Sequence, residues 1–163
     1  TGGRRLPLFV GEFSHDTGGQ DTFSPSVPGE ISHRKMSGDS FILTRGSFMA
    51  CTPGINLKTR FGGLKTMLSG EGAVFIECSG EGDLFFNTFG ALIEKDINGS
   101  FTVDTGHVVA WEPSLTYSIR GMGGLKSTLL SGEAVAMRFF QAPGISSCLL
   151  YSYALNPSVW TTR

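Results

Sequence analysis

The feature that most constrains the fold of this chain is an internal repeat. Residues 40–63, SFILTRGSFMACTPGINLKTRFGG, match residues 100–124, SFTVDTGHVVAWEPSLTYSIRGMGG, at an offset of 60 positions. Both copies then run into nearly the same phrase, GGLKTMLSGEGAVFI from Gly62 and GGLKSTLLSGEAVAM from Gly123. An ordered match of this length predicts repeated structural units that pack against one another to bury a shared core.

Partial copies flank the two full ones. The opening TGGRRLPLFVGEF places Gly2 and Gly3 sixty positions before Gly62 and Gly63, but it lacks the LSGE segment. The end of the chain, VWTTR, follows a divergent stretch. We therefore predict one domain, residues 1–163, of three units of about 60 residues each, with the first and last incomplete: residues 1–61, 62–122 and 123–163.

Each unit has the pattern of short β-strands. Ile55–Thr59 and Leu115–Ile119 alternate apolar and polar residues, as a strand with one buried face does. Turn signals recur at intervals that favour an all-β sandwich, prism or barrel. Helical candidates are limited to the short segments Leu64–Leu68 and Leu125–Leu130. Further apolar runs predicted to be strands are Phe41–Leu43, Phe48–Ala50, Ala73–Cys78, Leu84–Phe86, Phe101–Val103, Val108–Trp111 and Ala134–Phe140.

Composition narrows the classes of partner. The net charge is −1, whereas nucleic-acid binders usually carry a basic excess, so we expect no nucleic-acid partner. Charged residues make up 17% of the chain against the usual ~25%, which indicates that part of the surface is covered by protein partners or by self-association. No apolar run is long enough for a transmembrane helix, although peripheral membrane association stays open.

The sequence DTG at Asp104 resembles the catalytic segment of an aspartic protease, and a second DTG begins at Asp16. The repeat, however, aligns Asp104 with Thr44, and only the glycines of the two turns, Gly46 and Gly106, are shared. We therefore predict a strand, a tight turn with glycine at positive φ, and a returning strand, with Asp104 capping its own turn. An aspartic-type hydrolase at Asp104 is the remote alternative.

The repeated GGLK phrase marks a second candidate site. Neither copy fits the phosphate-binding pattern G-x-x-x-x-G-K-[ST], so we interpret the phrase as a structural corner that could also contact a ligand or partner. The candidate contact residues are Gly62, Gly63, Lys65, Gly123, Gly124 and Lys126.

The sequence contains no motif typical of other catalytic or metal sites. The histidines, His15, His33 and His107, lie in three remote regions without metal-ligand spacing, so we predict neither a metal nor a cofactor. No G-x-S-x-G motif is present. The cysteines, Cys51, Cys78 and Cys148, form no C-x-x-C pair and are expected to be reduced and buried. Trp111 and Trp160, at corresponding strand ends, are expected to belong to the core rather than to an interface.

Five phrases in order, GGLKTMLSGEG, FGALIE, VDTGHVVAWEPSL, GGLKSTLLSGE and VWTTR, resemble the altered-inheritance-of-mitochondria family, number twenty-four, also called mitochondrial biogenesis. The resemblance covers nearly the whole chain from Pro7 onward and departs at residues 145–158. It implies a fold similar to that of the tryptophan RNA-binding attenuation protein, in which three β units with swapped strands form an internal pseudo-trimer of the double-stranded β-helix or β-prism type. It carries over no catalytic residue.

The preferred hypothesis is a non-enzymatic scaffold or assembly protein. The resemblance implies a role in mitochondrial or membrane-complex organisation for a eukaryotic member, which would be mitochondrial. For a bacterial or archaeal member, expected in the cytoplasm, it implies no defined role. The alternative is a module that binds a small ligand, or RNA, at the GGLK corners, although a shared fold does not carry function by itself.

Overall fold

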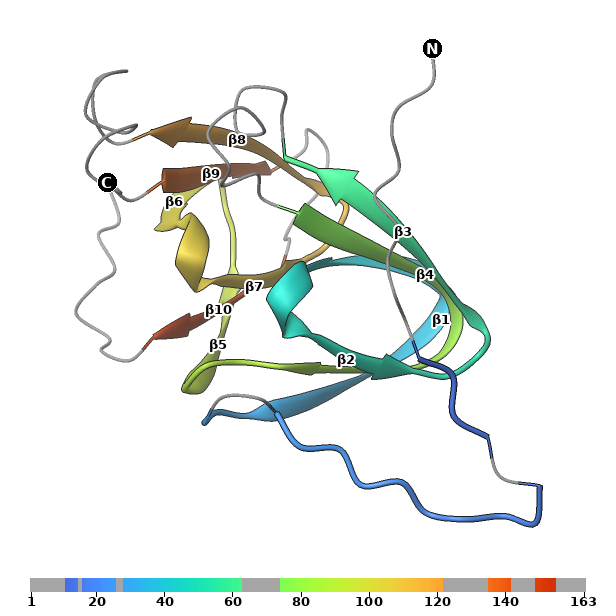
Figure 1. The fold of residues 1–163 in the computed structure, drawn as a ribbon. Coiled ribbons are helices and arrows are strands. Elements are labelled where there is room, and N and C mark those ends of the chain that lie inside the picture. The colour runs from blue at the N-terminus through green and yellow to red at the C-terminus, as the bar shows by residue number, and fades with distance from the viewer. Residues whose placement is uncertain are drawn as a thin grey trace.

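The fold is built almost entirely from β-strands, as the computed structural model shows for residues 11–14, 16–25, 28–62, 74–121, 135–141 and 149–154 (Figure 1). These described residues contain no α-helix, and the all-β prediction is confirmed. The elements, in chain order, are β1 (Ile31–Thr44), the 3-10 turn η1 (Arg45–Ser47), β2 (Phe48–Cys51), β3 (Ile55–Phe61), β4 (Val74–Asn87), β5 (Ala91–Asp96), β6 (Ser100–Asp104), the 3-10 turn η2 (Thr105–His107), β7 (Val108–Trp111), β8 (Leu115–Gly121), β9 (Val135–Gln141) and β10 (Leu149–Ala154).

The strands form two antiparallel sheets. The larger sheet has the order β2-β4-β1-β7-β10-β5, with β3 also paired to β4. The smaller sheet has the order β6-β9-β8 and lies at the opposite side of the ribbon view from the paired β1 and β4 (Figure 1). Strands predicted from alternation and from short apolar runs, including β3, β7 and β8, are present.

The repeated sequence segments also repeat in structure. Elements η1, β2 and β3 reappear sixty residues later as η2, β7 and β8, each with unchanged length. The hydrogen-bonded registers also recur, because Ile55 lies opposite Gly80 in the β3–β4 pair and Leu115 lies opposite Gln141 in the β8–β9 pair. We call β1–β4 the first unit and β5–β10 the second unit. The three-unit division of the whole chain stays a prediction.

The second unit divides two strands that are continuous in the first. In the first unit β1 and β4 are each 14 residues long and pair with each other along most of their length. In the second unit β5 and β6 together replace β1, and β9 and β10 together replace β4. The pairing of β10 with β7, Leu150 opposite Trp111, repeats that of β4 with β2, Leu84 opposite Cys51, including its register shift. Thus the divergent stretch at residues 145–158 contains a strand of the repeat.

Glycines allow β4 to stay continuous. The predicted runs Ala73–Cys78 and Leu84–Phe86 belong to this one strand, apart from Ala73, which lies outside the described residues. Gly80 and Gly82 between them have positive φ values of 124° and 147°. A Cβ on Gly80 would collide with the carbonyl oxygen of Gly54, so this close approach requires glycine.

Each unit contributes a hydrophobic cluster to the core. Trp111 is fully buried, as predicted, with edge-on ring contacts to Phe75, Tyr117 and Phe139 at centroid distances of 4.9, 5.5 and 5.3 Å. Such contacts add to the stabilisation from burial. Trp160 lies outside the described residues. The cluster of the first unit consists of Met36, Phe41, Leu43, Ile55, Ile76, Cys78, Leu84 and Phe86, together with Val109 and Ala110 of β7.

The segments just before the two units lie side by side. Gly29 and Gly90 form a parallel bridge, and the Gly90 N–H donates to the carbonyl of Pro28 at 3.0 Å. The Thr88 N–H donates to the carbonyl of Glu30 at 2.9 Å. A Cβ on Gly29 would collide with the carbonyl oxygen of Thr88, so this contact also requires glycine.

Candidate functional site

Of the six candidate residues at the predicted GGLK corners, one lies within the described part of the chain. Gly62 follows β3 and is half-buried. The other five candidates, and both predicted helical segments, lie outside the described residues: Gly63, Lys65, Gly123, Gly124, Lys126, Leu64–Leu68 and Leu125–Leu130. Contact of these corners with a ligand or partner therefore stays a prediction.

The DTG segment forms a capped turn. The Gly106 N–H donates to Asp104 Oδ1 at 2.7 Å, which confirms the predicted cap. The predicted positive φ is wrong, because neither Gly46 nor Gly106 has one. The chain closes both turns as 3-10 turns, η1 and η2, whose right-handed backbone is open to any L-residue. Residue Asp16 lies on the exposed N-terminal segment.

Groups with the chemistry of a catalytic or metal centre are scattered. Across the described ranges, no three His, Cys, Asp or Glu side chains gather as metal ligands would. His33 Nε2 lies 2.7 Å from Asp83 Oδ1, but both side chains are well exposed. Burial, helped by Cys51 and Glu77, raises the pKa of the buried Cys78 thiol to about 12, so this thiol is protonated at neutral pH. Cys51 is half-buried, and Cys148 lies outside the described residues.

The contact that joins the two units is the best-defined candidate site. We call it the unit junction: the C-terminal end of β1 pairs antiparallel with β7. Ile42 lies opposite Trp111, and Leu43 lies opposite Ala110. The Thr44 hydroxyl donates to the carbonyl of Val109 at 3.2 Å. All four residues of β7 are buried, because β1 and β10 flank this strand on both sides.

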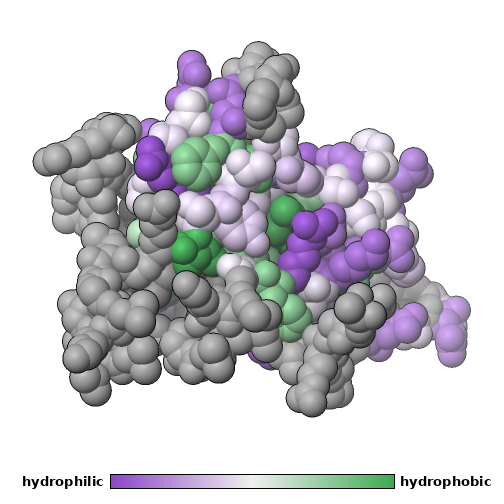
Figure 2. All heavy atoms as spheres, turned by 90° about the horizontal axis from the view of Figure 1, so that it is seen from above, coloured by the Kyte–Doolittle hydropathy of each residue, from purple (hydrophilic) through white to green (hydrophobic). Residues whose placement is uncertain are grey.

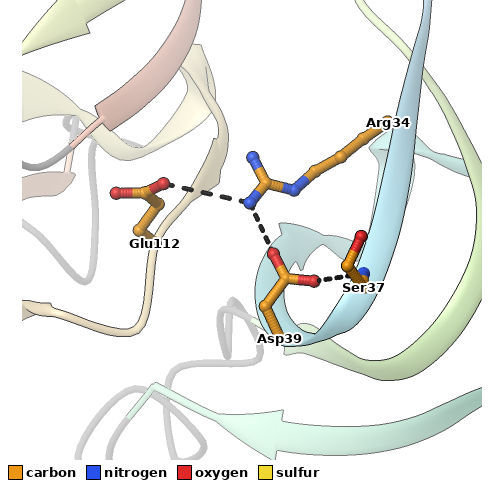
Figure 3. A network of polar contacts seen from close by, with 4 residues as sticks. All are labelled: Arg34, Ser37, Asp39 and Glu112. Atoms are coloured by element: carbon orange, nitrogen blue, oxygen red, sulfur yellow. Dashed lines mark hydrogen bonds and ion pairs between the residues drawn. The ribbon is translucent and has the colours of Figure 1, made fainter.

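A polar network supports the unit junction (Figure 3). Arg34 Nη2 lies 2.7 Å from Asp39 Oδ2 and 3.9 Å from Glu112 Oε1, which belongs to the second unit. The Ser37 N–H donates to Asp39 Oδ1 at 3.0 Å. Burial, the largest single influence, raises the pKa of Asp39, but the hydrogen bonds from Arg34 and Ser37 outweigh it and leave the pKa below its usual value.

The same arginine also packs against the core. The Arg34 guanidinium lies 4.5 Å from the ring centre of Phe41. The equivalent pair in the second unit is Lys95 over Phe101, at 4.8 Å. A cation over an aromatic face is attracted by the ring quadrupole. The same type of stabilising contact therefore occurs at equivalent positions of the two units.

Each unit also carries one half of a junction that is not completed within the described residues. In the second unit β6 corresponds to the end of β1, but its described neighbour is β9 alone. In the first unit β2 corresponds to β7, but its described neighbour is β4 alone. The four residues of β2 are all half-buried, in contrast to the fully buried β7. We call these the open edges: β6 and β2 occupy the repeat positions of the end of β1 and of β7, which pair with each other.

The surface elsewhere is mixed in character. On the face shown in Figure 2, hydrophobic side chains emerge in separate places among pale and hydrophilic ones. The most exposed large hydrophobic side chains of the described residues, Phe13 and Phe23, lie on the N-terminal segment that runs away from the sheets (Figure 1). No described helix is long and apolar enough to cross a membrane.

These observations define a class: an all-β protein in which repeated units join through strand edges. The chain belongs to the mitochondrial biogenesis AIM24 family, whose model matches residues 3–144. It is similar to an uncharacterized protein of Streptococcus pyogenes serotype M6, with 28% identity over 135 residues that cover 81% of this chain. It also resembles a crystal structure of a Streptococcus pyogenes protein, with 26% sequence identity and a TM-score of 0.67 over 83% of this chain.

The chain is short compared with these relatives. The matches span 54% of the length of the uncharacterized protein and 58% of the crystallised one.

Sequence reasoning missed the unit junction. It aligned β2 with β7 correctly, but alignment does not say which strand lies beside which. One signal was available: Cys51 corresponds to Trp111, and a large aromatic residue at one copy of a repeated position indicates a more enclosed environment there.

Proposed function

We propose that this chain is a non-enzymatic assembly module whose units join edge to edge. The observation that supports this most directly is the unit junction, where β1 and β7 pair across the two units. The open edges of β6 and β2 are the two halves of a further junction of the same kind. Adding a strand to an exposed sheet edge is a common mode of protein association, since backbone hydrogen bonds supply affinity and flanking side chains supply specificity.

The three-unit pseudo-trimer implied by the family is a finer form of this proposal. A third unit would offer a β7-like strand to β6 and a β1-like strand to β2, and the greater length of the bacterial relatives leaves room for one. A role in mitochondrial or membrane-complex organisation stays a prediction. The described residues offer no observation that favours the small-ligand alternative or the hydrolase alternative over assembly.

The proposal is tested by blocking one edge. Thr102 on β6 is exposed, and Thr116 on β8 is an exposed threonine in the same three-stranded sheet. We expect the wild-type chain to associate with rising concentration in light scattering, Thr102→Lys to weaken association several-fold, and Thr116→Lys to leave it unchanged. Equal weakening by both variants, or a single-chain mass of the wild type at every concentration, would contradict the proposal.

A further inference from the structure

We propose that Asn98 is a site of spontaneous deamidation and that Gln141 slows this reaction while the protein is folded. Asn98-Gly99 is the one Asn-Gly dipeptide in the sequence, and it forms the corner between β5 and β6. Asn98 is exposed, so water and hydroxide reach it freely. An asparagine followed by glycine is especially prone to deamidation, because glycine has no side chain to shield its own backbone nitrogen.

The reaction uses the backbone nitrogen of Gly99 as its nucleophile. This nitrogen loses its proton to a base and attacks the side-chain carbonyl carbon of Asn98. The new C–N bond closes a succinimide ring, and the side-chain amide nitrogen takes up a proton and leaves as ammonia. Water then opens the ring at either carbonyl group, which gives aspartate or isoaspartate. The overall change consumes one water and releases one ammonia, so it needs no oxidant, reductant or cofactor.

Gln141 of β9 engages both backbone polar groups of Gly99. The Gly99 N–H donates to Gln141 Oε1 at 3.1 Å, and the Gly99 carbonyl accepts from the Gln141 N–H at 2.9 Å. A hydrogen bond to the neutral form of an acid disfavours its ionisation, so the first contact opposes loss of the proton that the attack requires. The second contact limits the backbone motion that ring closure needs. The folded corner is therefore protected by one residue of the neighbouring strand.

The first unit forms the equivalent corner without this side-chain contact. Its counterpart of Asn98-Gly99 is Ser37-Gly38, and both glycines have a positive φ, 86° and 87°. The residue at the repeat position of Gln141 is Gly80, which has no side chain to offer an acceptor. The glutamine acceptor is thus present in the unit whose corner contains an asparagine and absent from the unit whose corner contains a serine, which cannot form a succinimide.

Deamidation changes the charge of this corner. The products carry a carboxylate at the start of β6, whereas Asn98 is neutral. The first unit already has a carboxylate at its corner, Asp39, which forms the ion pair with Arg34. Isoaspartate also lengthens the main chain by one methylene group. Because both products gain a negative charge, anion-exchange chromatography separates them from the unmodified chain.

Incubation at mildly alkaline pH tests the proposal, with peptide mapping by mass spectrometry to quantify aspartate and isoaspartate at position 98. We expect slow deamidation of the folded wild-type chain and much faster deamidation of the same chain unfolded in urea. Folded Gln141→Leu should react about fivefold faster than the wild type, the rate change that corresponds to loss of one net hydrogen bond. Gln141→Glu keeps an acceptor oxygen beside the Gly99 nitrogen and should react no faster than the wild type.

A further variant separates this contact from a general loosening of β6. Asp104→Ala removes the cap at the other end of β6 but leaves both Gly99 contacts in place, so it should react like the wild type. Circular dichroism checks that each variant is folded, and the comparison of folded with unfolded wild type needs no variant.

The outcomes that overturn the proposal are distinct. Equal rates in the folded and unfolded wild type, or in folded Gln141→Leu and the wild type, overturn the protection by Gln141. Equal acceleration by Asp104→Ala or by Gln141→Glu overturns the role of the acceptor oxygen. The absence of reaction at Asn98 even in the unfolded chain overturns the modification site itself.

Discussion

The two units carry the same ladder of strands, but only the first keeps it continuous. In the first unit β1 runs through a corner at Gly38, where φ is 87°, and remains one strand. In the second unit the equivalent Gly99 has φ of 86°, yet the chain leaves β5 before it and begins β6 after it. The buried residue before each corner, Met36 or Ile97, is also conserved in position.

The difference shows that a glycine and a buried apolar residue are enough to form the corner. Whether the strand stays continuous through the corner depends on residues inserted next to it. The first unit has one extra residue at this corner, Asp39, which forms the ion pair with Arg34. The second unit lacks that residue, and its aromatic cluster replaces Cys51 and Cys78 of the first unit by Trp111 and Phe139.

The largest expected effect on stability comes from removing the buried aromatic residue that distinguishes the second unit from the first. Replacing Trp111 by the cysteine of the first unit should lower the free energy of unfolding by about 3–5 kcal/mol, because a fully buried ring leaves a cavity among three other rings. Chemical denaturation measures the loss. The matched variant Cys51→Ala, at the half-buried counterpart, should cost much less, and equal losses would show that the two positions are equally enclosed.

A somewhat smaller effect is expected where the segments preceding the two units touch. Gly29→Ala should destabilise the fold by about 2–4 kcal/mol, because the new methyl group would collide with the carbonyl of Thr88. Gly46→Ala is the control, since a Cβ there meets nothing within 4 Å and φ is not positive. The control should be neutral or stabilising by up to about 1 kcal/mol, and thermal denaturation compares the two.

Alkaline pH should weaken the first unit through its buried cysteine. The pKa of Cys78 is about 12 in the fold, against a reference value of 9.0. The unfolded chain therefore loses this proton at a lower pH than the folded chain, so stability is fully present below about pH 9 and falls as the pH rises toward 12. Denaturation at pH 8 and pH 11 should show a smaller loss for Cys78→Ala than for the wild type. Burial also raises the pKa of Tyr117, which leaves a residual slope in both proteins.

The smallest effect concerns the corner that distinguishes the units. Asp39→Asn should cost roughly 0.5–1 kcal/mol at pH 7, as expected for a partly exposed ion pair. Because the pKa of Asp39 is lowered in the fold, this contribution is present above about pH 4 and disappears as the pH falls through the folded value. Stability curves of the two proteins should converge at low pH, and a constant difference would show that the charge is not responsible.

The sequence was sufficient to predict where individual strands and turns lie, but not which strands pair with each other. Alternation at Ile55–Thr59 and Leu115–Ile119 predicted β3 and β8, and the aligned turns predicted the cap at Asp104, because these depend on residues close in the chain. The pairing of β1 with β7 depends on residues nearly seventy positions apart, which a strand pattern does not encode.

The glycine prediction failed for a different reason. A glycine shared by both copies suggested a left-handed backbone at Gly46 and Gly106. A short connection between strands can also be made by a right-handed 3-10 turn, and the chain uses this turn in both units. Positive φ values occur at other glycines instead, among them Gly38 and Gly99 at the corners of the two units, where no hairpin was expected. Composition alone does not separate these two uses of glycine.

The contact between Gly29 and Gly90 has a geometric consequence. These glycines occupy equivalent positions, 61 residues apart, and a point lies beside its own image only near the rotation axis that relates the two. The pseudo-symmetry axis of the units therefore passes close to this bridge. Any translation along the axis cannot exceed the spacing of two paired strands, about 4.8 Å. A translation this small for each unit excludes a fibre of long pitch.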